Sequence, residues 1–536
     1  MATARPESLK AHWKCILACT LVSMCPFQYG VDFGIIGGLQ AMPGFLKIFG
    51  YPVPLDVSPV GYNIGHTRQQ LISSLMILGA FISSSTAGPI ATFAGRKMSI
   101  WAAALLCCVA NVIMMTTTSI GALYFSRFLI GIANGMLMTF SQLYLQECAP
   151  ARYRGLVIGL FNTWTSIGTL VGTVIDNFTV KLHGKDQYFV SLAIIYVVPG
   201  LLALGLFFIP ESPRWYLQHG KTEKARKALN WLRPFPETVD DEVSQIKEAI
   251  DAEKALAQGA AVVDMFRNPV DRRRTLLAVG AVSLQAASGA MYMISYGTYF
   301  FEIAKVGSPF ENSCILVAVG VFAILVNSAM ITRFGRRRIF LTVGMCLCGV
   351  TQLIVAIVYT KQGANTSSGK VIVGVSVIYI IGYNGMVATY AWLCGGEFPS
   401  QRLRSYTFGL AASIGFLGAW LATFTAPYFI NPDSLNWGPK YGYIWFPSCL
   451  LGALWTWLYL PEVQNRTFEE IDEMFEARLP ARKFRQHRCV GSVAAVAMAA
   501  KADGSESSEK DHGNVAHQEV ILGNQKAAVE TAMAIR

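Results

Sequence analysis

Residues 29–38 read Y-G-V-D-F-G-I-I-G-G and lie inside a long apolar stretch, residues 13–39, whose single acidic residue is Asp32. A bilayer core requires about 20 mostly apolar residues per helix, so this stretch is long enough to cross a membrane. An ionised carboxylate at the centre of a membrane helix costs at least about 2.5–3.5 kcal/mol on insertion scales. Such a group persists where it lines a cavity or has a partner, so the decapeptide predicts a polar feature inside the membrane.

Apolar windows of this kind recur along the chain. Its residues are 53% hydrophobic and only 14% charged, with a mean hydropathy of +0.41, whereas soluble chains carry about 25% charged residues. The windows suggest about twelve spans. They lie at residues 13–39, 67–90, 98–117, 119–145, 155–178, 188–209, 275–301, 312–332, 339–359, 371–394, 406–430 and 442–460. We therefore predict an all-α polytopic membrane protein.

The basic residues are concentrated in the loops on one side of the predicted spans. If the N-terminus is cytosolic, the short inner loops hold Arg96, Lys97, Arg152, Arg154, Arg333, Arg336, Arg337, Arg338, Arg402 and Arg404. The outer loops hold fewer cations, among them Lys181, Lys185, Lys305 and Lys440. The positive-inside rule then predicts that both termini are cytosolic. The rule also accounts for the net charge of +11, so we expect no nucleic-acid partner. We expect the protein to lie in the plasma membrane.

A polar, charged stretch at residues 210–274 divides the spans into two groups. Its helical runs predict a cytosolic helical segment, and the C-terminal end of the chain is polar and poor in aromatic residues, which favours disorder. We expect a cytosolic N-terminus (1–12), a first six-helix bundle (13–209), an intracellular helical linker (210–274), a second six-helix bundle (275–460), a cytosolic C-terminal helix (461–484) and a disordered tail (485–536).

The two groups of spans repeat the same loop chemistry. G-P-I-A-T-F-A-G-R-K (88–97) corresponds to I-T-R-F-G-R-R-R (331–338), Glu147 and Arg154 to Glu397 and Arg404, and P-E-S-P-R-W (210–215) to P-E-V-Q-N-R (461–466). Repeats of this kind are typical of transporters that expose a central site to each side of the membrane in turn. A membrane enzyme has no need of such symmetry, and we therefore predict that the protein is not an enzyme.

Several motifs in this order resemble the sugar porter family of the major facilitator superfamily, over roughly residues 13–484. They are S-R-F-L-I-G (126–131), L-Y-L-Q-E-C-A-P-A-R-Y-R-G (143–155), P-E-S-P-R-W-Y-L (210–217), and Gln285 with Ser288-Gly289. T-Y-F-F-E (298–302), E-F-P-S-Q-R-L-R-S (397–405) and N-P-D-S-L-N-W-G-P-K (431–440) are similar to fungal α-glucoside and maltose permeases. The resemblance implies two pseudo-symmetric six-helix bundles that transport a sugar.

In proton-coupled members of this family, the positions that match Asp32 and Arg127 form a protonation switch. The resemblance therefore implies that protonation of Asp32 would release Arg127 and alter the packing of the first and fourth spans. The glycines around Asp32 would also let neighbouring helices approach closely. Two alternatives remain: a static buried ion pair, or an acid at a helix end that faces the outer water.

The paired Glu and Arg residues of the inner loops predict a gate of salt bridges at the cytosolic helix ends. Its candidate members are Arg96, Lys97, Glu147, Arg154, Arg214, Arg336, Arg337, Glu397 and Arg404. The alternative is that these charges only set the topology of the helices.

A sugar site needs amide groups and aromatic faces. The resemblance points to Asn162, Gln285, Asn384 and Trp392, with Tyr296 and Tyr299 as nearby aromatic residues. Helix packing is the alternative role of each. The chain departs from the family pattern by having Ala286, Met291 and Gly415 where polar residues are expected. The second half of the pocket would therefore offer fewer hydrogen-bond partners than a glucose site.

We therefore predict a secondary active transporter of a hexose or α-glucoside, working by alternating access with proton symport. A uniporter, or a carrier of a polyol, a quinate-like acid or a secondary metabolite, remains an alternative, and a sugar receptor is disfavoured because known receptors have longer cytosolic tails. The 12 cysteines form no C-x-x-C pair, so we expect no metal site, and we expect no cofactor. Asn177 and Asn365 are candidate outer glycosylation sites, and we expect a monomer in the lipid bilayer.

Overall fold

The computed structural model describes residues 12–54, 58, 60–149, 151–258, 262–304, 307–334, 336–363, 365–400, 402–464, 466, 468–487 and 489. These residues fall into two compact units. The larger unit comprises the residues up to 464 together with 480–485, and the smaller comprises 466–479 and 486–489. The predicted N-terminal segment 1–12 and the tail 485–536 lie almost entirely outside the described residues.

The first half of the larger unit is helical apart from one short antiparallel hairpin. Its helices are α1 (Trp13–Val22), α2 (Met24–Leu39), α3 (Pro43–Phe49), α4 (His66–Ala94), α5 (Arg96–Thr116), α6 (Ile120–Cys148), α7 (Ala151–Thr179), α8 (Asp186–Ile194) and α9 (Val197–Gly205). The hairpin consists of β1 (Tyr51–Pro52) and β2 (Tyr62–Asn63). We call the end of the unit that carries α3 and this hairpin the hairpin end.

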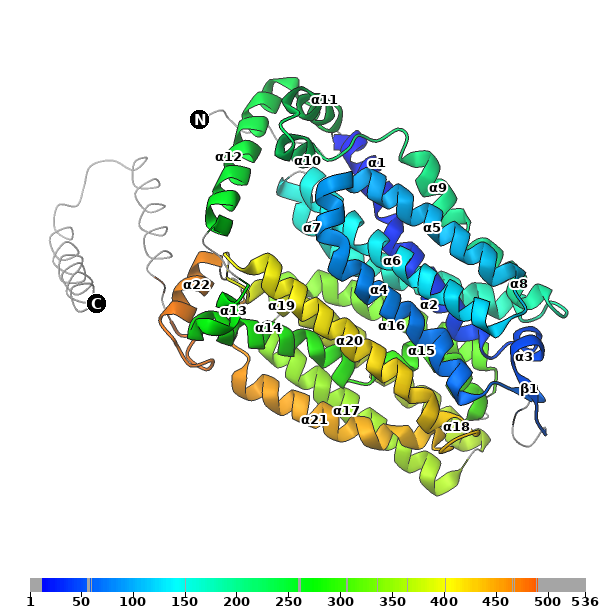
Figure 1. Ribbon diagram of the computed structural model, residues 1–536. Coiled ribbons are helices and arrows are strands. Elements are labelled where there is room, and N and C mark those ends of the chain that lie inside the picture. Colours follow the sequence, from blue (N-terminus) through cyan, green and yellow to red (C-terminus); the bar gives the residue numbers. More distant parts are fainter. Residues whose placement is uncertain are drawn as a thin grey trace. The chain divides into compact units, whose positions relative to one another are not determined.

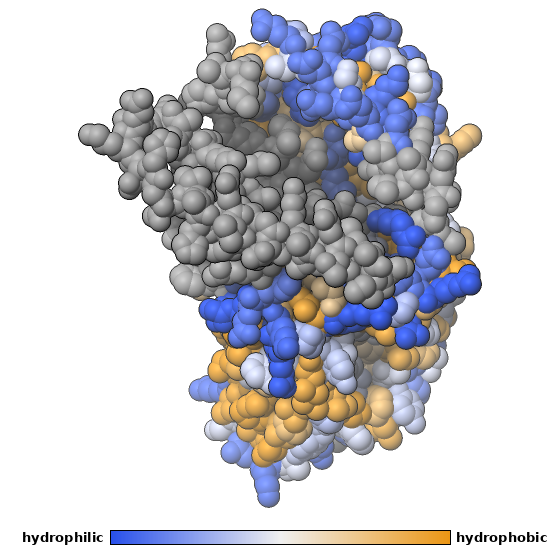
Figure 2. Space-filling model, turned by 90° about the vertical axis from the view of Figure 1, so that its left-hand side faces the viewer, coloured by the Kyte–Doolittle hydropathy of each residue, from blue (hydrophilic) through white to orange (hydrophobic). Residues whose placement is uncertain are grey.

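The linker forms α10 (Pro213–Gln218), α11 (Thr222–Leu232), η2 (Pro236–Thr238), α12 (Val239–Gln258) and α13 (Asp264–Arg267). Helices α10 to α12 lie at the opposite end of the unit, which we call the linker end (Figure 1). Figure 2 shows this end from outside, and α11 and α12 form the hydrophilic surface at its top. Arg233 anchors the linker, because it forms an ion pair with Glu242 at 2.6 Å and donates to the backbone oxygen of Cys148 on α6 at 3.0 Å.

The second half is also helical. Its elements are α14 (Pro269–Ala287), α15 (Ala290–Ile303), α16 (Pro309–Phe334), α17 (Arg337–Gln362), α18 (Thr366–Gly382), η3 (Tyr383–Ala388), α19 (Thr389–Glu397), α20 (Arg404–Ile430), η4 (Gly438–Tyr441) and α21 (Gly442–Tyr459). The smaller unit contains α22 (Phe468–Glu476), where Arg466 forms an ion pair with Glu470 at 3.3 Å.

Ten helical stretches among the described residues are long and apolar enough to cross a membrane. The two other predicted spans, 155–178 and 442–460, correspond to α7 and α21. This confirms the predicted all-α polytopic fold. Within the halves, α2 packs on α7, α4 and α5 pack on α6, and α17 packs on α18 and α21; between the halves, α4 contacts α20, α7 contacts α16 and α2 contacts α15 (Figure 1).

Glycines bring α2 and α7 into backbone contact. A Cβ atom at Gly30 or Gly34 would collide with the α7 backbone, and one at Gly168 or Gly172 would collide with the α2 backbone. Small residues four apart on both helices allow this close approach. Because the glycine face of α2 is occupied by α7, Asp32 is directed to another neighbour.

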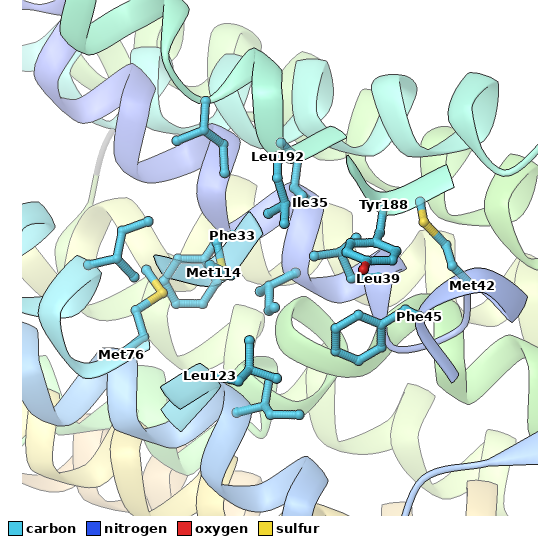
Figure 3. Packing of buried hydrophobic residues seen from close by; sticks show 14 of the residues in the cluster. Phe33, Ile35, Leu39, Met42, Phe45, Met76, Met114, Leu123, Tyr188 and Leu192 are labelled. Carbon is cyan, nitrogen blue, oxygen red and sulfur yellow. The ribbon is translucent and has the colours of Figure 1, made fainter. Parts of the chain in front are cut away.

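Apolar side chains fill the first half around this part of α2. Figure 3 shows Phe33, Ile35 and Leu39 of α2 among side chains of the neighbouring helices, including Met76 of α4 and Leu192 of α8. The cluster is buried from solvent. A charge on α2 is therefore surrounded by a dry environment and needs a partner from within the protein.

Two spans of the second half are interrupted. Between α14 and α15 the chain turns at Gly289, whose φ of 78° lies in the left-handed region that favours glycine. Between α18 and α19 the π-helix η3 replaces regular α-helix. Interruptions inside spans free backbone groups and often occur at functional sites.

Candidate functional site

Asp32 and Arg127 form a fully buried ion pair between α2 and α6. Arg127 Nη1 lies 3.1 Å from Asp32 Oδ1, and the two side chains are 1% and 0% exposed. The structure therefore brings together the two residues that the sequence paired.

Arg127 also connects the pair to α4. Its Nε donates to the backbone oxygen of Ile72 at 3.0 Å, and its Nη2 lies 3.0 Å from the sulfur of Met76. Asn134, on the next turns of α6, donates to Asp32 Oδ2 at 3.4 Å. A buried ion pair is sustained by such additional hydrogen bonds, and it becomes strongly unfavourable when one partner is removed.

The sequence analysis did not single out a second buried carboxyl group, that of Asp176 on α7. Its Oδ1 accepts a hydrogen bond from Ser191 at 2.9 Å, and Ser191 also contacts Thr179. No Lys, Arg or His in the described part of the chain forms an ion pair with Asp176, and besides Ser191 only the backbone of Gly38 is seen there to hydrogen-bond to its carboxyl group. The environment of Asp176 is therefore suited to a neutral group, in contrast to that of Asp32.

Gln285 and Asn384 lie at the two interruptions of the second half. Gln285 is in the last turn of α14, and its Nε2 is 3.4 Å from the backbone oxygen of Ala388 in η3. Asn384 is half-buried within η3 itself. Amide groups are thus placed where two interrupted helices meet, which is a suitable location for binding a polar solute.

The other candidate binding residues are more dispersed. Trp392 is half-buried, with its ring 6.0 Å from that of Phe408 and 6.3 Å from that of Phe416. Asn162 of α7 belongs to the first half and is exposed.

Tyr296 and Tyr299 of α15 lie at the hairpin end and bind residues from the first half. Tyr296 donates to the backbone oxygens of Thr423 at 3.0 Å and Gln69 at 3.4 Å. Tyr299 donates to the side chain of Asn63 at 2.9 Å. Both hydroxyl groups are thus engaged between the halves and not with Asn162, Gln285 or Asn384.

Asn431, which follows α20, completes this contact. Its amide donates to the backbone oxygen of Ile64 at 2.8 Å and to the side chain of Gln69 at 3.1 Å, and it accepts from Asn63 at 3.2 Å. His66 and Asp433 approach to 3.3 Å beside it. We call Asn63, Gln69, Tyr296, Tyr299 and Asn431 the hairpin-end seal.

At the linker end, two carboxylates hold the start of α5 in place. Arg96 forms an ion pair with Glu147 at 2.7 Å, and Glu147 also accepts a hydrogen bond from Ser212. Glu211 accepts from the backbone nitrogens of Arg96 and Lys97 at 3.0–3.1 Å. Burial raises the pKa of Glu211 above its usual value, although the backbone donors of Ser212, Lys97 and Arg96 oppose this effect. Lys97 donates to the backbone oxygen of Ile209 at 3.0 Å and does not contact Glu147.

The second half repeats this arrangement at α17. Arg337 forms an ion pair with Glu397 at 2.8 Å. Glu462 accepts from the backbone nitrogens of Arg337 and Arg338 at 3.1 and 3.2 Å. Arg337 is therefore the structural counterpart of Arg96, one residue later than the sequence repeat suggested, and Arg336 is exposed at the N-terminus of α17.

The remaining candidate gate residues are not all described in the same detail. Arg214 and Arg404 are half-buried, and each has an interaction partner. Arg154 belongs to α7, but its side chain lies outside the described residues. Both described ion pairs, Arg96–Glu147 and Arg337–Glu397, stay within one half.

The described hydrogen bonds between the halves are concentrated at the hairpin end. In addition to those of the seal, Ser58 donates to Glu302 at 3.2 Å and Cys314 to the backbone of Thr173 at 3.5 Å. Towards the linker end, Ser85 and Ser413 approach to 3.4 Å. The halves are thus joined most strongly at one end.

A family model described as sugar (and other) transporter matches residues 18–475. The chain belongs to this sugar transporter family. It shares 29% identity over 469 residues with the high-affinity glucose transporter ght2 of Schizosaccharomyces pombe, covering 85% of this chain and 86% of the relative. Over 505 residues it is 28% identical to the maltose permease MAL31 of Saccharomyces cerevisiae, covering 92% of this chain and 81% of the relative.

A further relative is a sensor. The high glucose sensor RGT2 of Saccharomyces cerevisiae is 25% identical over 484 residues, and the match covers 88% of this chain but only 62% of the sensor. Among solved structures, the inward-open conformation of the xylose transporter XylE from E. coli matches with a TM-score of 0.70 at 17% identity, covering 86% of this chain and 99% of that chain. This likeness supports the major facilitator fold, and membership of the sugar transporter family means that the chain is not an enzyme.

Sequence reasoning missed Asp176 and Glu302, two buried carboxyl groups of this family member. Each lies near the end of a predicted span, where an acid also suits a helix that emerges from the membrane. Only the structure places them inside, with Asp176 fully buried and Glu302 accepting from Ser58. The candidate glycosylation residues lie at the hairpin end, where Asn365 is exposed and Asn177 is half-buried, and their modification stays a prediction.

The two buried carboxyl groups are predicted to respond differently to neutralisation. Asp32→Asn leaves the Arg127 guanidinium buried without its counter-ion, and we expect it to lower the free energy of unfolding by about 3 kcal/mol. Asp176→Asn removes no ion pair and alters about one hydrogen bond, so a change within about 1 kcal/mol is expected. Thermal unfolding of the purified variants in detergent, followed by tryptophan fluorescence, measures both. Equal losses would contradict the assigned difference between the two sites.

The hairpin-end seal is predicted to depend on Asn431. Asn431→Ala removes hydrogen bonds to Ile64, Gln69 and Asn63, each contributing about 1 kcal/mol. Hydrogen–deuterium exchange should become faster in residues 60–69 and 290–303. The matched control is Asn365→Ala, which removes an exposed amide at the same end that bonds only within its own half. Exchange that stays unchanged in Asn431→Ala, or rises equally in both variants, would show that Asn431 does not hold the halves together.

Proposed function

We propose that the protein carries a sugar across the membrane by alternating access and couples this movement to a proton. The single observation that carries the proposal is the buried Asp32–Arg127 pair, which lies inside a pseudo-symmetric bundle whose halves are joined mainly at one end. A charge pair of this kind is costly inside a membrane and is retained for function. XylE, whose fold this chain shares, is described as a proton:xylose symporter.

The distribution of contacts supports a state that is closed at the hairpin end and open at the linker end. The seal joins the halves at the hairpin end, whereas the carboxylate–arginine pairs at the linker end each tie helices of one half together. In the opposite state the seal would open and the linker ends would approach. The arginines and carboxylates already assembled there, Arg96 with Glu147 and Arg337 with Glu397, would then form contacts across the halves.

Helix α4 offers a mechanical link between the proton site and the seal. Arg127 binds the backbone oxygen of Ile72, and Gln69, one turn earlier on α4, binds Asn431 and Tyr296. Protonation of Asp32 removes the negative charge that holds Arg127, which leaves the guanidinium with its contacts to α4. A shift of Arg127 would then move α4 relative to α20, where the seal lies.

The candidate substrate site lies between the seal and the linker end. Gln285 and Asn384 offer amide groups at two helix interruptions, Asn162 offers another from the first half, and Trp392 offers an aromatic face. Amides and aromatic rings suit sugar hydroxyl groups and apolar ring faces. The names of the relatives ght2 and MAL31 favour a hexose or an α-glucoside.

The residues of the second half of the pocket support an alternative substrate. Ala286, Met291 and Gly415 provide no side-chain hydrogen bonds where the family pattern has polar residues. A polyol, a quinate-like acid or a less polar metabolite would suit such a pocket, and a uniporter would use the same fold without a proton. We further propose that the linker end is cytosolic, that the protein lies in the plasma membrane and that it acts as a monomer.

Uptake of labelled mono-, di- and trisaccharides, with a polyol and a quinate-like acid, tests the substrate. The measurement uses cells that lack their own carriers, at two external pH values. Saturable uptake of a sugar that increases at the lower pH is expected. Uptake of only the non-sugar solutes would favour the alternative, and sugar-dependent signalling without uptake would indicate a sensor.

The coupling role of Asp32 is predicted to separate accumulation from exchange. Asp32→Asn should abolish accumulation against a gradient, because the variant cannot take up and release a proton there, while exchange of labelled for unlabelled substrate continues. Asp176→Asn is the matched control and should keep accumulation. Both are measured in proteoliposomes with and without a pH gradient. Accumulation that survives Asp32→Asn would remove Asp32 from the coupling mechanism.

A further inference from the structure

Three side chains that can ligate a metal meet in the smaller unit. They are Glu473 of α22, His487 and Cys489, and their ligand atoms all lie within 4.8 Å of one another. Glu473 Oε1 and His487 Nε2 are 3.7 Å apart. Two ligands of a tetrahedral zinc ion are about 3.5 Å apart, because zinc–ligand bonds are about 2.0–2.3 Å long. The three atoms can therefore reach one ion after shifts of about 1 Å.

The donor atoms and their charges suit zinc. Cysteine sulfur and histidine nitrogen are ligands that zinc favours, and a carboxylate oxygen is its third common ligand. Calcium and magnesium prefer oxygen ligands alone. A Cys489 thiolate and the Glu473 carboxylate together balance the charge of one divalent ion, and the neutral imidazole of His487 adds no charge. Three protein ligands leave a fourth position, which water can fill.

Arg466 holds the segment that carries two of the three ligands. Its Nη2 donates to the backbone oxygen of His487 at 2.7 Å, and its Nη1 lies 4.0 Å from Cys489 Sγ. Arg466 also pairs with Glu470 of α22 at 3.3 Å. A cation beside a sulfur favours the thiolate, which is the form that binds a metal. Partners of this kind orient metal ligands, so His487 and Cys489 are positioned against α22 before any ion binds.

Glu473 and Cys489 also have other partners within the chain. Cys489 is fully buried, and its sulfur lies 3.8 Å from the backbone oxygen of Glu470, to which the thiol can donate. Burial raises the pKa of this thiol, and Arg466 opposes the effect. Zinc would replace the thiol proton, so its binding should release about one proton. One ligand atom from each side chain is enough for the site, and neither side chain has to be without partners.

The sequence expectation of no metal site was based on the absence of a C-x-x-C pair. The present cluster contains a single cysteine, in H-R-C (487–489), and takes its carboxylate from α22. Cysteine spacing gives no signal for a site with one sulfur, one nitrogen and one oxygen ligand. The expectation therefore does not apply to a site of this kind.

We propose that Glu473, His487 and Cys489 bind a zinc ion, which fastens residues 486–489 to α22. Residues 487 and 489 belong to no helix or strand. A metal crosslink to a helix would therefore stabilise their position, as structural zinc does in small domains. The proposal concerns the smaller unit alone and does not depend on which solute the protein carries.

Zinc binding to the full-length, tag-free protein in detergent tests the proposal. The protein is first treated with a chelator, and zinc is then titrated in competition with a chromophoric chelator. Cys489→Ser should bind zinc at least about 100-fold more weakly, because even the loss of an outer partner of a ligand costs about 10–100-fold. His487→Gln should have a similar effect. The matched control is Cys346→Ser, which removes a half-buried cysteine outside the cluster and should leave the affinity unchanged.

Two glutamates of α22 form a second matched pair of variants. Glu473→Gln removes the carboxylate ligand and should weaken zinc binding at least about ten-fold. Glu476 is exposed and does not belong to the cluster. Glu476→Gln should therefore change the affinity less than about two-fold, as expected for a surface charge.

Cobalt(II), which can replace zinc in tetrahedral sites, reports the ligands directly. A sulfur-to-cobalt charge-transfer band should appear in the wild type and be absent from Cys489→Ser. Zinc should also slow hydrogen–deuterium exchange in residues 468–489 of the wild type, because it joins this segment to α22. Exchange in Cys489→Ser should not respond to zinc.

Three results would overturn the proposal. Tight zinc binding that survives in Cys489→Ser would place the ion elsewhere. Equal weakening by Glu473→Gln and Glu476→Gln would indicate general attraction to an acidic surface. Calcium binding as tight as zinc binding would show that sulfur and nitrogen are not ligands. Thermal unfolding of Cys489→Ser at the wild-type temperature keeps its weaker binding from being a consequence of misfolding.

Discussion

The Asp32–Arg127 ion pair is the constraint on which the first half depends. Neither charge can reach water, so both must find partners inside the protein. The glycine contact between α2 and α7 leaves Asp32 facing α6, where Arg127 holds it and at the same time binds α4 through Ile72. Three helices are thus fixed around one carboxylate. A change in the charge of this carboxylate affects the interactions of α2, α4 and α6 at the same time, whereas the loss of a single apolar contact would not.

The two halves place the same kinds of groups at the linker end, where α5 and α17 begin. A helix start has free backbone N–H groups, and a carboxylate that accepts from them is favourable there. Glu211 does this for α5 and Glu462 for α17, while Glu147 and Glu397 hold the first arginine of each helix. Each pair lies within one half. In the proposed transport cycle, a rigid-body movement of the halves would keep each pair intact and bring its charged groups closer to the other half.

Much of this architecture was predictable from the sequence because it follows from composition and repetition. The spans follow from apolar length, and the need of Asp32 for a partner follows from the cost of a lone charge in a membrane, whereas Arg127 as that partner is what the family resemblance implies. The sequence repeat aligned Gly95-Arg96 with Gly335-Arg336, but the helix start selects Arg337, since the backbone groups bound by Glu462 decide the register. The roles of the tyrosines of α15 and the burial of Asp176 depend on contacts between helices that are far apart in the sequence, and local sequence patterns do not indicate such contacts.

The position of Gln69 determines how the proton site and the seal can communicate. One α-helical turn separates it from Ile72, and a turn of hydrogen-bonded helix moves as a rigid piece. Gln69 binds Asn431 and Tyr296 of the second half, while Ile72 binds Arg127. The two sites need no connecting series of side-chain contacts, because the backbone of α4 forms part of both. In the proposed mechanism, this rigid turn links the charge of the carboxylate to the closure of the hairpin end, and symport would require such a link.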